Sequence, residues 1–244
     1  MSALLETMNL SKKFAGLVAN QGIQFSLEAG SIRCVIGPNG AGKTTFISMI
    51  SGHLSPTEGR ILYKNQDITG LSVMRRARIG IARKFQTPTV FDNLTAYQNI
   101  ELAVLGSGRP RAKRHGRIFE VLELIRLADA WDRPVQFLSH GQRQWLEVGL
   151  LIAIEAELLL LDEPTAGMTA EETASTAQLV QMLVQEFKLS VIIIEHDINF
   201  IRDLRAPVTV LHLGRVLLEG SFEEVAANDQ VREVYLGHEG GERP

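Results

Sequence analysis

The chain has 244 residues, of which 45% are hydrophobic and 22% are charged, and its formal net charge is −3. This composition excludes a disordered or fibrous protein, and the small net charge gives no overall basic surface for nucleic acid, which is not expected as a partner. The single cysteine, Cys34, excludes an intrachain disulfide and is expected to lie in a buried strand. No window holds the roughly 18 consecutive apolar residues of a membrane span, and the first residues are too polar for a secretion signal.

The N-terminal part of the chain predicts short strands and one helix. Strand-like segments at 3–10, 23–30, 31–37 and 59–68 are separated by glycine-containing turns and predict a small antiparallel sheet beside a core. Residues 44–54 are instead apolar at helical spacing and follow a glycine-rich turn. The order of strand, glycine loop and helix is typical of a phosphate-binding loop.

The middle of the chain predicts helices rather than strands. Residues 94–106 and 117–131 are both apolar at helical spacing, and the basic segment at 108–117 joins them. We expect this basic segment to be a solvated loop; contact with phospholipid head groups or RNA is a less favoured alternative. Residues 89–138 are therefore expected to form an inserted α-helical subdomain.

The C-terminal part of the chain alternates apolar strands with helices, which predicts a parallel sheet covered on both faces. The expected fold is one α/β domain over 1–244, with a parallel-sheet core and an antiparallel β subdomain built from 1–88 and 139–244. The expected elements are a helix beginning near Ser139, a strand at 156–164, a helix at 170–187, a strand at 189–197, a strand or hairpin at 206–220 and a short helix at 223–237.

The stretch GPNGAGKT, from Gly37 to Thr44, matches the phosphate-loop pattern G-x-x-x-x-G-K-[ST] in full. Its glycines let backbone N–H groups turn towards phosphates, Lys43 places a positive charge on the β- and γ-oxygens, and Thr44 offers its hydroxyl to Mg²⁺. A glycine turn that merely caps a helix is the alternative, which the complete match after a strand disfavours. The expected ATP-binding residues are Gly37, Pro38, Asn39, Gly40, Ala41, Gly42, Lys43, Thr44 and Thr45.

Two adjacent carboxylates, Asp162 and Glu163, end the apolar strand LLLLDEP. Buried acids without partners would become neutral, and a metal ion supplies the missing partner. We therefore expect Asp162 to hold Mg²⁺, directly or through a water, and Glu163 to take a proton from the attacking water.

Two further polar residues stand at expected junctions of the core. Gln86, between core and helical insertion, could reach the metal or the attacking water, and His196, after the strand VIIIE, could reach the γ-phosphate. A histidine at such a strand end is more often a structural residue, and a single glutamine before a loop means little.

The stretch LSHGQRQWLEVG begins a helix in an unusual way. Ser139 is expected to cap it, and Gly141 is expected to leave backbone N–H groups bare at the positive end of the helix, where an anion can approach. The stretch predicts either an ordinary capped helix or half of a nucleotide site.

The chain resembles the ATP-binding cassette ATPases over essentially its whole length. The resemblance rests on the stretch LSHGQ together with four other features, which are the glycine loop, the acids Asp162 and Glu163, Gln86, and His196. The resemblance implies a RecA-like core and identifies Phe14 as the aromatic that stacks on adenine, Gln86 as the Q-loop residue and His196 as the switch histidine. It also implies that Ser139, Gly141 and Gln142 contact the γ-phosphate of ATP bound to a second subunit. Two residues depart from the common pattern: His140 replaces a glycine of the signature motif, and Thr169 replaces the D-loop aspartate.

Three short sequences resemble the branched-chain amino acid importer group: HGQ followed by QWLE, AGMT followed by ET, and VREVYLG near the end of the chain. The resemblance is closest to the first ATPase subunit of the urea-transporting branch of this group. The function expected from this resemblance is therefore an ATPase that powers uptake of urea, with branched-chain amino acid import as the alternative. Export of lipopolysaccharide is a less favoured alternative, and an ATPase without a transporter is weaker still. A coiled-coil DNA-repair protein and a two-cassette translation factor are disfavoured, because the chain has neither a long coiled coil nor a second cassette.

The resemblance also implies partners and a location. It implies transmembrane permease subunits, a second ATPase that is either a similar chain or a second copy, and indirectly a substrate-binding protein. The expected location is the cytoplasmic face of the inner membrane, as a peripheral subunit.

Overall fold

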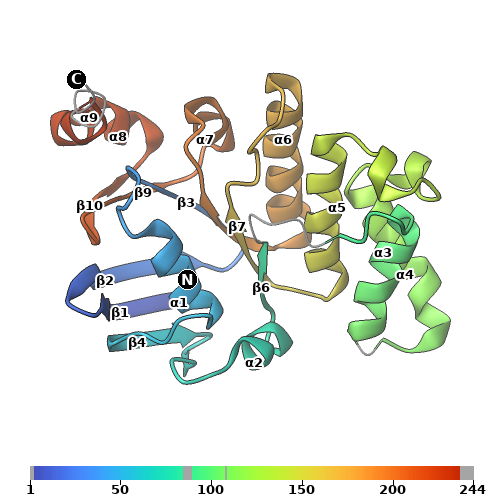
Figure 1. The fold of residues 1–244 in the computed structure, drawn as a ribbon, viewed down its shortest axis with the longest axis horizontal. Helices are drawn as coiled ribbons and strands as arrows, with labels where there is room; N and C mark the ends of the chain where they lie inside the picture. Colours follow the sequence, from blue (N-terminus) through green and yellow to red (C-terminus); the bar gives the residue numbers. More distant parts are fainter. Residues whose placement is uncertain (1–2, 85–89, 108, 237–244) are drawn as a thin grey trace.

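A computed structural model describes residues 3–84, 90–107 and 109–236 of the chain, and Figure 1 shows their arrangement. Two sheets and a set of helices form an α/β structure, as expected from the sequence. No helix in the described part of the chain is long and apolar enough to cross a membrane.

An antiparallel sheet with strand order β2-β1-β4-β5 lies on one side of the molecule. Its first two strands pair along almost their whole length, from Ala3 opposite Glu28 to Phe14 opposite Leu17. The antiparallel sheet was expected, except that the segment around Cys34 belongs to the other sheet. Its strands are β1 (Ala3–Phe14), β2 (Leu17–Glu28), β4 (Glu58–Tyr63) and β5 (Gln66–Asp67).

The central sheet has the order β10-β9-β3-β8-β7-β6, in which all strands but the edge strand β10 run parallel. Its central strands are apolar and buried on both faces, as the sequence predicted for a parallel sheet. The segment 206–220, expected to be a strand or a hairpin, is a hairpin of β9 and β10. The strands are β3 (Ile32–Ile36), β6 (Ile81–Lys84), β7 (Leu158–Asp162), β8 (Ser190–Ile194), β9 (Val208–His212) and β10 (Arg215–Gly220).

Alternate residues of the central strands enter different cores, because successive strand side chains point to opposite faces. Leu158 and Leu160 pack towards α1 (Lys43–Ser51) and the antiparallel sheet, whereas Leu159 and Leu161 pack towards the helices on the other face. Cys34 is fully buried in the core that contains Leu159 and Leu161, which confirms that it is a buried strand residue.

The helices of the second face divide into two groups (Figure 1). Helices α5 and α6 lie against the central sheet, and α3 and α4 pack beside α5, at the far right of the view. Besides α1, the described helices on all sides of the molecule are α2 (Val73–Arg78), α3 (Ala96–Gly106), α4 (Arg111–Leu124), α5 (His140–Ala153), α6 (Ala170–Phe187), α7 (Ile198–Leu204), α8 (Phe222–Ala227) and α9 (Asp229–Leu236). Short 3-10 helices lie at Ala128–Ala130 and Val135–Phe137.

The basic segment was predicted wrongly as a loop. Its residues from Arg111 onwards form the first turns of α4, because arginine, alanine and lysine favour helix and Ile118, Val121 and Leu122 give the helix a buried face. Arg117 donates to the backbone oxygen of Ile152, which ties this segment to the end of α5.

Three smaller differences concern short elements. The sequence did not reveal α2 or the edge strand β6, which are only a few residues long. The single helix expected at 223–237 is divided into α8 and α9, because Asn228 between them adopts an extended backbone conformation.

Candidate functional site

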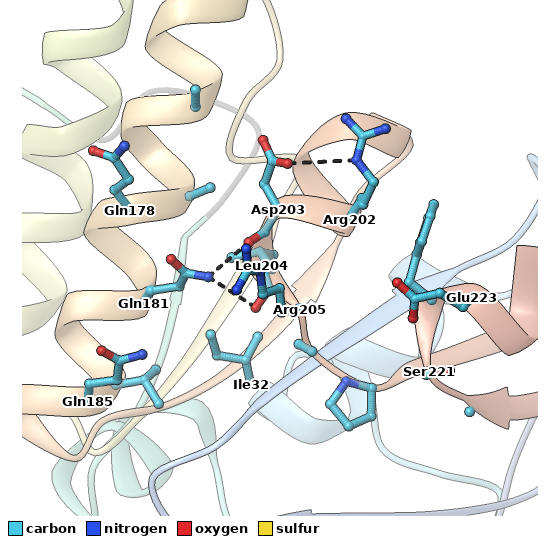
Figure 2. A pocket seen from close by; sticks show the side chains of 17 residues that line it. Ile32, Gln178, Gln181, Gln185, Arg202, Asp203, Leu204, Arg205, Ser221 and Glu223 are labelled. Atoms are coloured by element: carbon cyan, nitrogen blue, oxygen red, sulfur yellow. Dashed lines mark hydrogen bonds and ion pairs between the residues drawn. The ribbon is translucent and has the colours of Figure 1, made fainter.

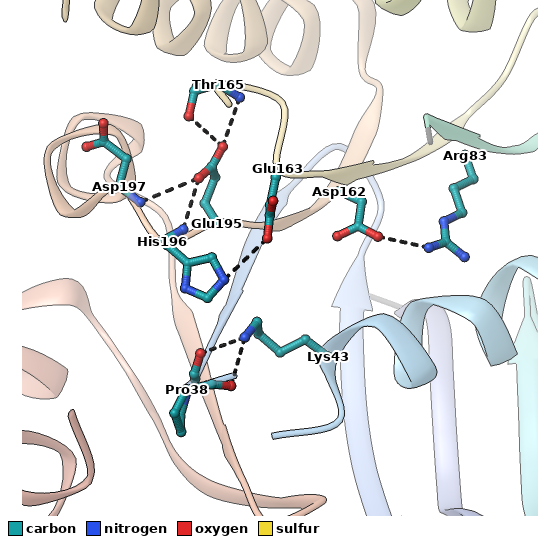
Figure 3. A network of polar contacts seen from close by, with 10 residues as sticks. Pro38, Lys43, Arg83, Asp162, Glu163, Thr165, Glu195, His196 and Asp197 are labelled. Carbon is teal, nitrogen blue, oxygen red and sulfur yellow. Dashed lines mark hydrogen bonds and ion pairs between the residues drawn. The ribbon is translucent and has the colours of Figure 1, made fainter. Parts of the chain in front are cut away.

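Three of the expected catalytic residues, Lys43, Glu163 and His196, meet at the edge of the central sheet where its parallel strands have their carboxyl ends. The glycine loop follows β3, Asp162 ends β7, and His196 follows β8 by two residues. Figure 3 shows Lys43, Glu163 and His196 around one space, with Asp162 beside it.

The backbone of the glycine loop requires glycine where it enters α1. Gly42 has a φ of 98° and caps the helix, and a Cβ at this position would lie 2.5 Å from the Ala19 backbone oxygen. A side chain would therefore be strained and would also displace β2. No side chain caps α1, so the N–H groups of its first turn are available to an anion.

Lys43 is buried, and its ammonium group lies inside the loop that precedes it. Its Nζ donates to the backbone oxygens of Gly37, at 2.6 Å, and Pro38, at 3.0 Å (Figure 3). Burial lowers the pKa of Lys43, and the nearby Glu163 and Asp162 carboxylates oppose that change. The loop thus holds a positive charge at the place where its backbone can receive phosphate.

Asp162 is 1% exposed and is paired with a cation that the sequence analysis missed. Its Oδ2 accepts from Arg83 Nη2 at 2.8 Å, and Arg83 also donates to Ser48 on α1. The second oxygen, Oδ1, is buried and has no hydrogen-bond partner among the residues that the structure describes. A buried carboxylate oxygen in this state fits a metal ligand, directly or through a water. Arg83 gave only a weak signal, because it is one of two adjacent charged residues in the four-residue strand β6.

Thr44 follows Lys43 in the first turn of α1 and lines the same cleft as Glu163. A hydroxyl and one carboxylate are the donors that Mg²⁺ uses when phosphates and waters complete its coordination. Within the described ranges, no cluster of three or more His, Cys, Asp or Glu side chains could hold a metal by itself. The donor set fits a magnesium ion that arrives with a nucleotide, rather than a resident metal.

Glu163 has a left-handed backbone conformation, with a φ of 50°, directly after the strand. This conformation is costly for a residue with a side chain, and it recurs at functional sites where the surrounding structure enforces it. The Glu163 side chain is about one-third exposed, and its Oε1 lies 3.4 Å from His196 Nε2. The side chain expected to take a proton from the attacking water and the side chain expected to reach the γ-phosphate therefore face each other.

Glu195 is a second residue that the sequence analysis missed. It is buried, and its two oxygens accept from the backbone N–H groups of Thr165 and His196, both at 2.9 Å. The carboxylate therefore ties the loop after β7 to the loop after β8 (Figure 3). Its position at the end of an apolar strand, like that of Asp162, was the available signal.

A cleft of about 470 Å³, called the Lys43 cleft below, extends from the glycine loop, Glu163 and His196 to the antiparallel sheet. Phe14 lies at its edge, 40% exposed at the end of β1, with Lys12 Nζ 5.1 Å from the ring centroid. The described residues that line the cleft are Phe14, Leu17, Val18, Ala19, Asn39, Gly40, Ala41, Gly42, Lys43, Thr44, Thr45, Glu163 and His196.

Ser139 caps α5, as the sequence predicted, and Gln142 completes a capping box. The expectation of bare N–H groups was wrong. The Gln142 N–H donates to Ser139 Oγ, and the Gly141 N–H donates to Glu172 of α6. Among the described residues, those that line the Lys43 cleft include neither Ser139 nor Gly141 nor Gln142. One chain therefore does not bring its signature helix to its own glycine loop.

The two departures from the common pattern each have a local structural role. His140 Nε2 lies 2.8 Å from the Ala166 oxygen, so this side chain contacts the loop after β7. Thr169 caps α6, where its side chain accepts from the Glu172 N–H. Gln86, the expected Q-loop residue, lies outside the described residues.

A larger groove of about 1230 Å³ lies away from these motifs, between α6, α7 and the start of α8 (Figure 2). Glutamines of α6 line one wall, and Gln181 Nε2 donates to the Asp203 and Leu204 backbone oxygens at 2.8 and 3.3 Å. This contact attaches α7 to α6. None of the expected site residues that the structure describes lines this groove.

Comparison with protein families gives two matches. A family model described as "ABC transporter" matches residues 20–166, and one described as "Branched-chain amino acid ATP-binding cassette transporter" matches residues 215–241. The first match contains the glycine loop, Asp162 and Glu163, and the second begins at β10 and continues through α8 and α9.

Similar proteins match over nearly their whole length. The "Probable branched-chain amino acid transport ATP-binding protein LivG" of Archaeoglobus fulgidus is 35% identical, with 98% of this chain and 97% of that protein covered. The "High-affinity branched-chain amino acid transport ATP-binding protein BraF" of Pseudomonas aeruginosa is 31% identical, with 96% of this chain and 98% of that protein covered.

Solved structures of cassettes share the fold. An ATP-binding cassette of an ABC transporter in its ADP conformation superposes with a TM-score of 0.88 at 28% identity, covering 97% of this chain and all of that one. The cbiO1 protein from Clostridium perfringens, part of the ABC transporter complex cbiONQ, gives a TM-score of 0.87 at 28% identity, covering 97% of this chain and 96% of that one. The phosphate loop is complete, two adjacent acids stand at the end of β7, and the relatives match over nearly the whole chain. The chain therefore belongs to the ATP-binding cassette ATPases of ABC transporters, in the branched-chain amino acid transporter group.

Proposed function

We propose that the chain binds and hydrolyses MgATP to power an importer of branched-chain amino acids. The observation that carries the hydrolytic part is the convergence of Lys43, Glu163 and His196 on one cleft next to the glycine loop. The substrate class rests on the relatives, which carry the names of branched-chain amino acid transport proteins and match over nearly the whole chain.

In this proposal the residues from Gly37 to Thr45 hold the phosphates through backbone N–H groups, and Lys43 exchanges its loop carbonyls for β- and γ-oxygens. Phe14 supplies an aromatic surface for adenine at the other end of the cleft. Thr44, Asp162 and Gln86 would hold Mg²⁺, which neutralises charge on the phosphate oxygens.

Glu163 acts as the general base for the attacking water, and His196 orients the reacting groups. The 3.4 Å separation of Glu163 Oε1 and His196 Nε2 supports this pairing, as does the enforced left-handed backbone of Glu163. Glu195 fixes the two loops relative to each other and acts as a positioning residue.

The signature residues Ser139, Gly141 and Gln142 act on ATP bound to an opposing cassette, either a second copy or a similar ATPase. The separation of these residues from the Lys43 cleft of the same chain supports a composite site. A solved ABC transporter cassette with 25% identity to this chain is described as dimeric.

The remaining partners are transmembrane permease subunits and, through them, a substrate-binding protein. We place the chain as a peripheral subunit on the cytoplasmic face of the inner membrane. We further propose that residues 89–138, which include α3 and α4, form a helical subdomain that meets the permease together with the Q-loop around Gln86, so that closure of the ATP site moves the permease.

Urea is the second candidate substrate, because the short sequences HGQ and AGMT resemble those of the urea-transporting branch. Cells with and without this chain would be given labelled leucine and labelled urea in parallel. Loss of leucine uptake with unchanged urea uptake supports the first proposal, and the opposite result reverses the ranking. If uptake of neither leucine nor urea is lost, the result contradicts both substrates.

A further inference from the structure

Glu172, in the first turn of α6, completes the capping box of its own helix with Thr169 and also contacts the start of α5. Its Oε1 accepts from Ser139 Oγ at 3.0 Å and from the Gly141 N–H at 3.2 Å. Its Oε2 lies 3.1 Å from the Thr169 nitrogen, the N-terminal cap of α6. One carboxylate thus bridges the N-termini of two helices, α5 and α6.

The two donors on α5 are the groups that the proposed function assigns to the γ-phosphate of ATP on the opposing cassette. A hydroxyl and a backbone N–H each carry one hydrogen, so neither can donate fully to Glu172 and to a phosphate oxygen together. From this geometry we propose that Glu172 is an internal occupant of the signature site, which the γ-phosphate must displace when two cassettes close. The inference rests on the proposed composite site.

The fit of the carboxylate is close. A Cβ at position 141 would lie 2.6 Å from Glu172 Oε1 and 2.8 Å from its carboxyl carbon, so glycine permits this approach. The hydrogen bonds from Thr169, Ser139 and Gly141 lower the pKa of Glu172, although burial opposes them. Glu172 is therefore ionised at neutral pH, and its charge as well as its position opposes an incoming phosphate.

Neighbouring contacts hold α5 and α6 together in this arrangement. Trp145 Nε1 donates to Thr176 Oγ1 at 2.9 Å, and that hydroxyl lies 3.3 Å from the Met168 sulfur. His140 contacts the Ala166 oxygen on the same side. The residues that distinguish this chain from the common cassette pattern are thus gathered at one junction between the signature helix and the loop after the catalytic acids.

Displacement needs only a side-chain rotation. Glu172 is partly exposed, so Oε1 can turn to water while Oε2 keeps its contacts with Thr169. Glu172 consequently sets the ATP concentration at which two cassettes close, and its loss makes closure easier.

The test uses full-length chain carrying Glu163→Gln, which slows hydrolysis, and compares it with the same chain carrying Glu172→Gln in addition. Glutamine keeps the capping box but removes the charge. The control is Glu171→Gln, an exposed neighbour in the same helical turn with the same change of charge. MgATP-dependent association of chains would be followed by analytical ultracentrifugation over a range of ATP concentrations.

We expect Glu172→Gln to lower the ATP concentration for half-maximal association by about tenfold, and Glu171→Gln to leave it within about twofold. Equal values for the two variants would overturn the inference while the composite site stands. Absence of MgATP-dependent association in every chain would remove the composite site, and the inference with it.

A second measurement examines the contact in the unassociated chain. Hydrogen exchange at the Gly141 amide is expected to be several-fold faster in Glu172→Gln than in Glu171→Gln, because a neutral acceptor holds the N–H less strongly. Identical exchange rates would show that the carboxylate does not occupy the signature helix in solution, and would overturn the inference directly.

Discussion

Arg83 and Asp162 form a buried ion pair at 2.8 Å across the neighbouring strands β6 and β7, with side chains 7% and 1% exposed. The pair connects the aspartate expected to hold Mg²⁺ to the strand that leads towards Gln86. Because Asp162 Oδ2 accepts from Arg83, Oδ1 is the oxygen that could contact the proposed Mg²⁺.

Replacing Arg83 is expected to destabilise the fold, because it leaves the Asp162 carboxylate buried without its cation. For Arg83→Ala we expect a loss of about 3 kcal/mol in the free energy of unfolding, measured by urea denaturation. Arg78→Ala, an exposed arginine of α2, is the control and should change the value by less than about 0.5 kcal/mol. A similar small change in both variants would contradict a structural role for the pair.

Lys43→Ala is expected to weaken MgATP binding by about ten- to a hundredfold, because it removes a charge-assisted hydrogen bond to the phosphates. Isothermal titration calorimetry with MgATP measures the dissociation constant. Lys64→Ala, which removes an exposed lysine paired with Glu157, should leave it unchanged. Unaltered affinity in the Lys43 variant would place the phosphates elsewhere.

Glu163→Gln is expected to bind MgATP normally and to release phosphate about 10² to 10⁴ times more slowly, since the amide cannot accept the proton. His196→Ala, which removes the side chain 3.4 Å from Glu163, should also slow release with nucleotide binding largely intact. Phosphate release at saturating MgATP measures both. Normal turnover in Glu163→Gln would exclude this residue as the base.

The composite site predicts complementation between two inactive variants. Ser139→Arg alone and Lys43→Ala alone should hydrolyse little ATP, whereas their mixture forms pairs with one intact site and recovers a measurable rate. The rate should rise with total protein concentration, because it depends on pair formation. If either variant alone keeps full activity, each chain hydrolyses ATP without a partner's signature.

Cys34 is expected to resist alkylation in the folded chain. Burial raises the pKa of its thiol from 9.0 to about 12, and the nearby Glu195 adds to this effect while Arg33 opposes it. At pH 8 a thiol-directed reagent should therefore label Cys34 only after unfolding in urea. Rapid labelling of native protein would contradict the buried position.

The same shift predicts the direction of a pH effect on stability. Between pH 9 and about 12 the folded chain keeps the thiol proton that the unfolded chain loses, because the pKa is 9.0 in the unfolded chain and about 12 in the folded chain. The contribution of Cys34 to the free energy of unfolding is therefore complete below pH 9 and declines as the pH rises towards about 12. The free energy of unfolding should fall more steeply between pH 8.5 and about 10.5 for the natural chain than for Cys34→Ala. Parallel slopes would show that Cys34 does not contribute.

Local patterns in the sequence determined much of the fold and of the nucleotide site. The glycine loop is contiguous and its backbone chemistry is local, so residues 37–45 could be predicted as a phosphate-binding loop from spacing alone. Fully apolar segments before Asp162 and Glu195 identified parallel strands for the same reason, and Ser139 was recognisable as a helix cap from its neighbours. The basic segment was misassigned because its charges were read without the apolar stripe that follows in the same helix, α4.

Only the tertiary structure decided which residues meet across elements distant in sequence. Arg83 reaches Asp162 because β6 and β7 are neighbours, and Glu195 reaches Thr165 because β8 lies beside β7. Glu172 reaches Gly141 because α5 and α6 pack with their N-termini together. The Gly141 N–H, which was expected from the sequence to have no partner, therefore donates to Glu172. Spacing along a chain fixes the geometry of one turn or one strand, whereas the partners of a buried charge depend on how separate elements pack, and no local pattern contains that information.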